Sequence, residues 1–155
     1  MMEGKLAELT KALQQAAKER QESRVKGVGA LSQELLNREM VDWNRFTNRR
    51  QVGSYTGLCP GEDSTGDSRM MLPIDKHGNP RVRALLVEVA WLLPKFQPDY
   101  KPLQRWKWLF DRDKPAAASL RKKAVVALAR RLAIDLWRIK TGRAKAEDVG
   151  LKLAA

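Results

Sequence analysis

The chain has 155 residues, and 43% of them are hydrophobic, which is enough for one domain with its own core. Its 30 Lys and Arg against 18 Asp and Glu give a net charge of +12 and a sequence pI near 10.2. Such a charge favours phosphate-rich partners, above all nucleic acid, over neutral small molecules. Cys59 is the only cysteine and His77 the only histidine, so disulfide frameworks, zinc fingers and catalytic sites that need two such residues are excluded.

The longest apolar runs, at 84–87 and 89–94, are far shorter than the roughly 20 residues of a membrane span. The N-terminus also has no signal-peptide pattern. We therefore expect a soluble, cytoplasmic protein without a membrane partner, associated with the nucleoid of a bacterial or archaeal cell.

Residues 3–24 are expected to form an amphipathic helical arm, because Leu6, Leu9 and Leu13 recur at helical spacing. Acidic and basic residues nearly cancel in this segment, and the narrow apolar stripe is typical of a seam between two helices. Two interpretations stay open. The helix folds back on its own domain, or it forms an intermolecular coiled coil.

Residues 24–40 are expected to form a helix-hairpin-helix motif. Gly27 and Gly29 lie two apart, between the first helix and a second apolar-periodic run from Leu31 to Met40. In this motif the glycines permit a tight turn whose backbone N–H groups face a DNA phosphate, and Lys26 would add a cation. The same spacing joins helices in proteins that do not bind DNA, so a purely structural turn is the other interpretation.

Residues 41–55 are expected to form a short helix after a loop, with the aromatic residues Trp43, Phe46 and Tyr55 in the core. Residues 57–78 are expected to be an irregular loop with at most a short hairpin, because Gly, Ser, Asp and Pro interrupt any long helix. About twenty irregular residues are uncommon in a compact domain unless they have a function. This loop is therefore the candidate site.

The next helix is expected to begin at Asn79 as N-cap, with Pro80 in its first position, and to end at Pro94. Its buried stripe consists of Val82, Leu85, Leu86, Val89 and Leu93. Arg81 and Arg83 in the first turn oppose the helix dipole, which is mildly unfavourable unless an anion lies nearby. They are candidate phosphate-binding residues.

After a short helix with irregular flanks at 95–114, the last long helix is expected at 116–141, with Gly142 as its stop. Val125, Leu128, Leu132, Leu136 and Ile139 form its core stripe, and the opposite face gathers Lys123, Arg130, Arg131 and Arg138. Residues 119–145 carry +8 of the total charge of +12. A solvated basic face is the alternative, but this density favours binding to a nucleic-acid backbone through Lys123, Arg130 and Arg138.

The candidate loop contains two adjacent hydroxyl residues, Ser64 and Thr65, before Gly66. A hydroxyl that attacks a phosphodiester needs positive charge to stabilise the transition state. That charge is available in the basic residues of the loop and of the helix after it, Arg69, Lys76, Arg81 and Arg83. Turn and cap formation is the alternative role of such hydroxyl residues. A carboxylate site for Mg²⁺ is also conceivable from Glu62, Asp63, Asp67 and Asp75, although their spacing follows no known pattern.

Taken together, these segments resemble the C-terminal domain of the DEDD-type insertion-sequence transposases of the IS110/IS116 group, which are bridge-RNA-guided DNA recombinases. The resemblance covers residues 25–142. It rests on the order and spacing of four motifs, namely the glycine hairpin, the block QVGSYTGLCP at 51–60, the Ser64-Thr65-Gly66 loop and the block DKHGN at 75–79. In the family, the loop reads S-S-G and carries the serine nucleophile.

This resemblance implies DNA transposition through a covalent serine–DNA phosphodiester, with Ser64 as the favoured nucleophile. Thr65 is the alternative, because it precedes the glycine directly. The implied partners are DNA, a guide RNA, and a second copy or a full-length relative bound through residues 3–24. The family's RuvC-like domain, which binds Mg²⁺ through four acidic residues, has no counterpart here, so we expect no cofactor in this chain and Mg²⁺ only where that domain is present.

We therefore expect a mainly α fold with a helical arm at 1–24 and a transposase C-terminal domain at 25–155. Two functions stay open. The chain is a DNA-binding domain that acts through a hydroxyl nucleophile, or it is a catalytically inactive remnant that binds nucleic acid or assembles with a relative.

Overall fold

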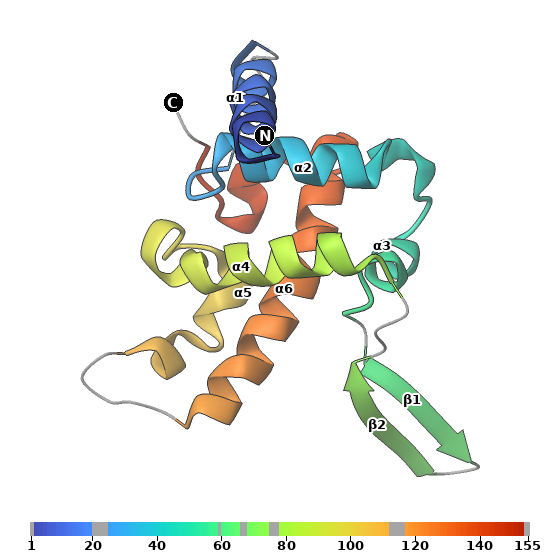
Figure 1. Ribbon diagram of the computed structural model, residues 1–155. Coiled ribbons are helices and arrows are strands. Elements are labelled where there is room, and N and C mark those ends of the chain that lie inside the picture. Colours follow the sequence, from blue (N-terminus) through green and yellow to red (C-terminus); the bar gives the residue numbers. More distant parts are fainter. Residues whose placement is uncertain are drawn as a thin grey trace.

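The computed structural model describes residues 2–19, 25–58, 60–65, 68–74, 78–111 and 117–153 and is mainly helical, as the sequence predicts (Figure 1). The elements in chain order are α1 (Met2–Glu19), α2 (Ala30–Met40), the 3-10 helix η1 (Trp43–Arg45), α3 (Arg49–Thr56), β1 (Pro60–Thr65), β2 (Ser68–Ile74), α4 (Pro80–Phe96), α5 (Lys101–Gln104), η2 (Lys107–Phe110), α6 (Ala118–Lys140) and η3 (Ala146–Val149).

Helix α6 is the centre of the core. Its segment 124–129 is entirely apolar, and the helix is covered by α3, α4, α5 and η2. Leu128, Ala129 and Leu132 have no exposed surface, and Val52 of α3 and Val82 of α4 are also fully buried in the same core. Gly142, in the left-handed conformation with φ of 76°, follows the helix end as predicted.

Helix α4 crosses α6 and begins as the sequence predicts, with Asn79 as N-cap and Pro80 in the first turn (Figure 1). The prediction that Pro94 ends it is wrong, because the helix continues to Phe96. A proline this close to the C-terminus removes one N–H from the ladder, and the backbone N–H of Gln97 still donates to the Leu93 carbonyl at 2.8 Å. The last turn therefore closes beyond the proline.

The segment at 57–78, expected to be irregular with at most a short hairpin, contains the antiparallel strands β1 and β2. Thr65 pairs with Ser68, so only Gly66 and Asp67 connect the strands. A two-residue connection that contains glycine suits a tight hairpin turn, and this local signal is stronger than the polar composition that suggests a loop. In Figure 1 the hairpin projects away from the helices.

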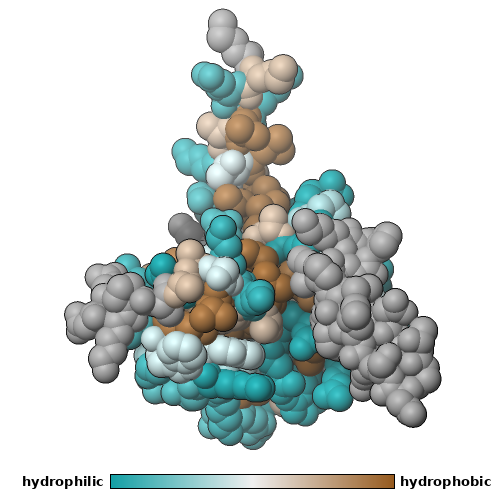
Figure 2. Space-filling view, turned by 90° about the horizontal axis from the view of Figure 1, so that it is seen from below, coloured by the Kyte–Doolittle hydropathy of each residue, from teal (hydrophilic) through white to brown (hydrophobic). Residues whose placement is uncertain are grey.

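Helix α1 contacts α2 and otherwise extends away from the domain (Figure 2). Its predicted apolar stripe is largely uncovered, since the exposed fraction is 67% for Leu6 and 61% for Leu9. Helix α1 thus packs on its own domain only in part, and the intermolecular coiled coil stays a prediction.

Candidate functional site

The predicted hydroxyl residues lie at the far end of the hairpin from the helices. Ser64 and Thr65 are the last two residues of β1, and the backbone register places Ser64 opposite Arg69 of β2. The backbone pairing therefore sets one predicted nucleophile opposite one predicted phosphate-binding residue. Lys76, with Cys59 and His77, lies outside the described residues.

The base of the hairpin is a tight crossing of two chain segments, which we call the neck (Gly57 and Gly78 with Tyr55). A Cβ atom added at Gly78 would lie 2.2 Å from the Gly57 nitrogen and 2.3 Å from the Tyr55 carbonyl oxygen. The backbone N–H of Asn79 donates to that carbonyl at 2.7 Å. Only glycine fits at position 78, so the segment before β1 and the segment after β2 are in close contact at Gly57 and Gly78.

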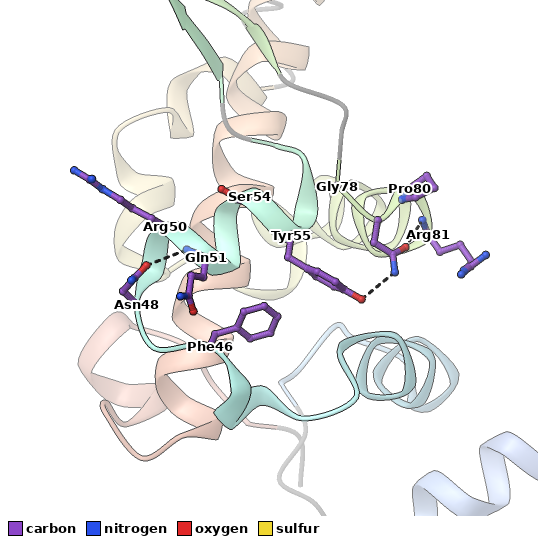
Figure 3. Close-up of a pocket in the computed structure, with 10 residues that line it drawn as sticks. Phe46, Asn48, Arg50, Gln51, Ser54, Tyr55, Gly78, Pro80 and Arg81 are labelled. Carbon is purple, nitrogen blue, oxygen red and sulfur yellow. Dashed lines mark hydrogen bonds between the residues drawn. The ribbon is translucent and has the colours of Figure 1, made fainter.

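A polar cluster fixes the neck to the end of α2, and we call it the neck network (Glu39, Tyr55, Asn79 and Arg81). The Tyr55 hydroxyl donates to the Glu39 carbonyl oxygen at 2.5 Å and accepts from Asn79 Nδ2 at 3.1 Å. Asn79 Nδ2 also donates to Glu39 Oε2 at 2.9 Å, and Arg81 Nε lies 2.6 Å from Glu39 Oε1. In Figure 3 the Tyr55 side chain points to the start of α4, beside Gly78 and Arg81.

The neck network favours the ionised form of Glu39. Hydrogen bonds from Asn79 and then from Arg81 hold the pKa of the Glu39 carboxyl below its ordinary value. Sequence reasoning missed Glu39 and gave Tyr55 only a core role. The available signal was the occurrence of Tyr55 and Asn79 in the two blocks that carry the family resemblance.

Arg81 and Arg83, the two arginines in the first turn of α4, have different environments. The Arg81 side chain is 74% exposed and is held at one end by Glu39. Arg83 is half-buried, and its Nη1 has no hydrogen-bond partner among the described residues. Both belong to the helix whose first turn adjoins the neck.

The glycine turn before α2 is attached to the C-terminal segment. Gly27 has φ of 95°, and a Cβ there would lie 2.6 Å from the Phe96 Cβ, so glycine is needed for packing. The Lys26 N–H donates to the Lys152 carbonyl, and buried Gln97 donates to both the Lys26 and Lys152 carbonyls. Gly29 is the N-cap of α2, and its surroundings are open.

The predicted binding residues do not form one cluster. The turn that contains Lys26, Gly27 and Gly29 packs on Phe96, at the C-terminal end of α4, whereas Arg81 lies in its first turn. A rise of 1.5 Å per residue separates these ends by about 24 Å. A ligand that touches both must be long, as a nucleic-acid duplex is.

The basic residues of α6 are less available than the helical pattern suggests. Lys123 is exposed, but Arg130 is half-buried. Arg138 Nη1 lies 3.4 Å from Oδ1 of the fully buried Asp135, which also pairs with Arg131 at 3.3 Å. The Tyr100 hydroxyl donates to Asp135 Oδ2 at 2.5 Å, and burial together with this carboxylate raises the pKa of Tyr100 above its ordinary value. Arg138 therefore also has a structural role.

Metal-binding and membrane-spanning features are both missing from the described part of the chain. It contains no group of three or more His, Cys, Asp or Glu side chains that could hold a metal ion. Within the same residues, no helix combines the length and the apolar character that a membrane crossing requires.

Most of this chain is similar in sequence to known transposases. Residues 22–104, from before the glycine turn to the end of α5, match the family model described as "Transposase IS116/IS110/IS902 family". The chain is similar to the putative transposase y4rJ of Sinorhizobium fredii, with 36% identity over 115 residues that cover 74% of this chain and 28% of that protein. It is also similar to the transposase for insertion sequence element IS1111A of Coxiella burnetii, with 32% identity over 121 residues, or 76% of this chain and 31% of the relative.

A shorter match has higher identity. The putative transposase y4qE of the same Sinorhizobium fredii strain is 45% identical over 67 residues, which cover 43% of this chain and 17% of that protein. The chain thus spans less than a third of the length of these relatives. No solved structure matches it.

Proposed function

Because the chain belongs to the IS116/IS110/IS902 family of transposases, we propose that it is a DNA-binding domain of a transposase that acts on a DNA phosphodiester through a hydroxyl of its hairpin. The observation that carries this proposal is the register of the hairpin, which places Ser64 opposite Arg69. The neck supports it, because a hairpin held by a backbone crossing can present its far end in a fixed position.

In the proposed step, Ser64 Oγ attacks the phosphorus of a DNA phosphodiester, and Thr65 is the alternative nucleophile. Oγ gives up its proton and forms a bond to phosphorus, the bond from phosphorus to one deoxyribose oxygen breaks, and that oxygen takes up a proton and leaves as a hydroxyl, so that the net number of protons is unchanged. Arg69 and Lys76 supply positive charge to the phosphoryl oxygens. Arg81 and Arg83 contribute from the start of α4, with the charge of Arg81 partly balanced by Glu39.

The DNA backbone is proposed to extend over two further surfaces. These are the exposed side of α6, with Lys123, Arg130 and the outer part of Arg138, and the turn at Lys26, Gly27 and Gly29, where the helix-hairpin-helix interpretation places a phosphate. Their separation fits a duplex better than a small ligand. A guide RNA is a second proposed partner for the same basic surfaces.

The described residues contain no cluster of ligands for Mg²⁺, so no step is assigned to a metal in this chain. The acidic domain of the family would supply the metal where it is present. The residues of the chain would bind the strand, position the phosphate and provide the hydroxyl.

The exposed apolar stripe of α1 is proposed to pair with the same helix of a second copy, and a full-length relative could substitute for that copy. Met2, Leu6 and Leu9 repeat at helical spacing and have exposed fractions of 89%, 67% and 61%. The double variant Leu6→Glu, Leu9→Glu should shift the chain to a monomer in sedimentation equilibrium without changing its helical core. A parent chain that sediments as a monomer at all concentrations would refute the pairing.

The test of the proposed function compares native and denaturing gels of the same samples. End-labelled duplex DNA with a nick that traps covalent intermediates is incubated with the parent chain, Ser64→Ala and Thr65→Ala. The proposal predicts label that stays with the protein after denaturation and is lost in one of the two variants. A native shift without any adduct, also when the N-terminal acidic domain of a relative is supplied, would instead support the alternative function, a nucleic-acid-binding module without its own chemistry.

A further inference from the structure

A hollow of about 850 Å³ lies beside the neck, between α3 and the first turn of α4. This volume is within the range of sites that bind small ligands. Tyr55 and Gly78 line both the hollow and the neck, so whatever occupies the hollow lies at the foot of the hairpin. The side chains that give it chemical character are Phe46, Asn48, Arg50, Gln51, Tyr55 and Arg81 (Figure 3).

The apolar part of the hollow consists of two aromatic rings. Phe46 is buried and Tyr55 half-buried, with ring centroids 5.4 Å apart and planes tilted by 59°. The Arg45 guanidinium lies 4.6 Å and 4.5 Å from the two centroids. Arg45 does not line the hollow, so it packs on the rings from outside it, and half-buried Tyr55 is the ring that has surface left for a flat ligand.

The polar rim consists of two side-chain amides. Asn48 Oδ1 accepts from the Gln51 N–H at 3.0 Å, and Gln51 Oε1 accepts from the Thr47 N–H at 2.8 Å. Both oxygens are therefore used by the backbone. In the part of the chain that the structure describes, neither amide NH₂ group donates to another residue. Two fixed donors at the edge of an aromatic floor suit the acceptor atoms on the edge of a nucleobase.

Two arginines flank the hollow. In Figure 3, Arg50 and Arg81 extend from opposite sides of it. Arg81 is paired with Glu39, whereas no described carboxylate pairs with the exposed Arg50. A nucleotide with its base in the hollow has one phosphate on each side, and the two cations fit that arrangement.

We propose that this hollow binds one unpaired nucleobase of the strand that the hairpin engages. The inference rests on the proposed function, because the strand must first be held by this chain. The base comes from DNA or from a guide RNA, which have the same flat, acceptor-bearing edge. Removal of a base from the stack has a cost that is smallest when the base is already unpaired, so the hollow favours nicked, bulged or single-stranded sites.

The experiment uses the full chain and a 24-base-pair DNA duplex with a single bulged 2-aminopurine. The comparison probes are the same DNA duplex fully paired, an RNA duplex with the same bulge, and that RNA duplex fully paired. Titration by anisotropy gives the affinity for each, and 2-aminopurine fluorescence reports stacking. We expect the bulged duplex to bind at least about 5-fold tighter than the paired one, with quenching of the probe, since stacking on an aromatic ring contributes about 5- to 150-fold per base.

Two variants each remove one donor of the rim, and Gln51→Met also removes the acceptor of the exposed Thr47 N–H. Asn48→Ser keeps an oxygen to cap α3 but removes the NH₂ donor, and Gln51→Met removes the second donor at similar size. Each should reduce the preference for the bulge by about 5-fold, the effect of one hydrogen bond, and leave affinity for the paired duplex unchanged. The matched control is Asn44→Ser, at an exposed asparagine outside the hollow. It should change neither the preference for the bulge nor the affinity for the paired duplex.

The outcomes separate the inference from the proposed function. Equal affinity for bulged and paired DNA and RNA, or a preference that survives both variants, overturns the nucleobase site while duplex binding still supports the proposed function. Failure to bind any probe overturns both. A preference confined to the RNA bulge supports the site and assigns the base to a guide RNA, and one confined to the DNA bulge assigns it to the DNA strand.

Discussion

Replacement of Gly78 by alanine should open the neck and destabilise the whole domain. The new Cβ would lie 2.2 Å and 2.3 Å from backbone atoms of Gly57 and Tyr55, whereas ordinary van der Waals separations begin at 3.4 Å. The neighbours are backbone rather than flexible side chains, so two chain segments must separate by more than 1 Å. That movement would also break the hydrogen bond from the Asn79 N–H to the Tyr55 carbonyl.

The magnitude follows from these two effects. Forced overpacking costs about 1–3 kcal/mol and the broken hydrogen bond about 1 kcal/mol, so the free energy of unfolding should fall by about 2–4 kcal/mol. For a domain of this size, the melting temperature should drop by about 5–15 °C. Thermal unfolding followed by circular dichroism measures both quantities.

Gly4→Ala is the matched control for this substitution. A Cβ at Gly4 has no atom within 4 Å, and alanine is the better helix former, so its melting temperature should stay the same or rise slightly. A Gly78→Ala protein that melts within about 2 °C of the parent would refute the reasoning, because the neck would then have room for a side chain.

Three further predictions concern strain, pH and charge. Val41 is 77% exposed and has φ of 67°, so Val41→Gly should stabilise the domain by about 1 kcal/mol in urea unfolding, and a loss of stability would count against backbone strain there. The neck network holds the pKa of Glu39 below its ordinary value, so the stability from this carboxylate is fully present above pH 4.5 and is lost as the pH falls through the folded pKa. Glu39→Gln should therefore reduce the loss of folding stability at acidic pH, and a variant with the same dependence of stability on pH as the parent would contradict this prediction. Replacement of Lys123 and Arg130 by neutral residues should reduce the slope of log affinity for DNA against log salt concentration by about 0.9 for each lost phosphate contact. An unchanged slope would show that α6 is not part of the DNA interface.

Local sequence signals predict most of the helical framework. Asn79 and Pro80 mark the start of α4, the apolar pattern marks α6, and glycine marks its end, because these signals depend on neighbours along the chain. Pro94 misleads because the cost of a proline depends on how near the helix end lies. For residues 60–74 the sequence predicts at most a short hairpin in an irregular loop, because the polar composition is typical of loops. The two-residue connection between Thr65 and Ser68 is the signal that favours paired strands.

The site is less predictable, because it depends on interactions between distant segments. Glu39 lies 40 residues from Asn79 in sequence, yet the two side chains are 2.9 Å apart. The exclusion of any side chain at Gly78 likewise appears only when Gly57 is placed against it. For α6, the helical pattern groups Arg138 with the free cations, and only the structure shows its pairing with buried Asp135.

The central claim is that a hydroxyl at the far end of the hairpin attacks the DNA phosphodiester. The most direct measurement treats the chain, with the acidic domain of a relative supplied, with DNA that carries a better leaving group at one phosphodiester, and then maps the adduct by tryptic digestion and mass spectrometry. Cleavage after Arg50 and Arg69 releases residues 51–69, whose hydroxyl residues are Ser54, Tyr55, Thr56, Ser64, Thr65 and Ser68. The account predicts a nucleotide mass on this peptide that fragmentation assigns to Ser64 or Thr65 and that one alanine variant removes. An adduct at any other residue of this peptide or on another peptide, or no adduct under these conditions, would contradict it.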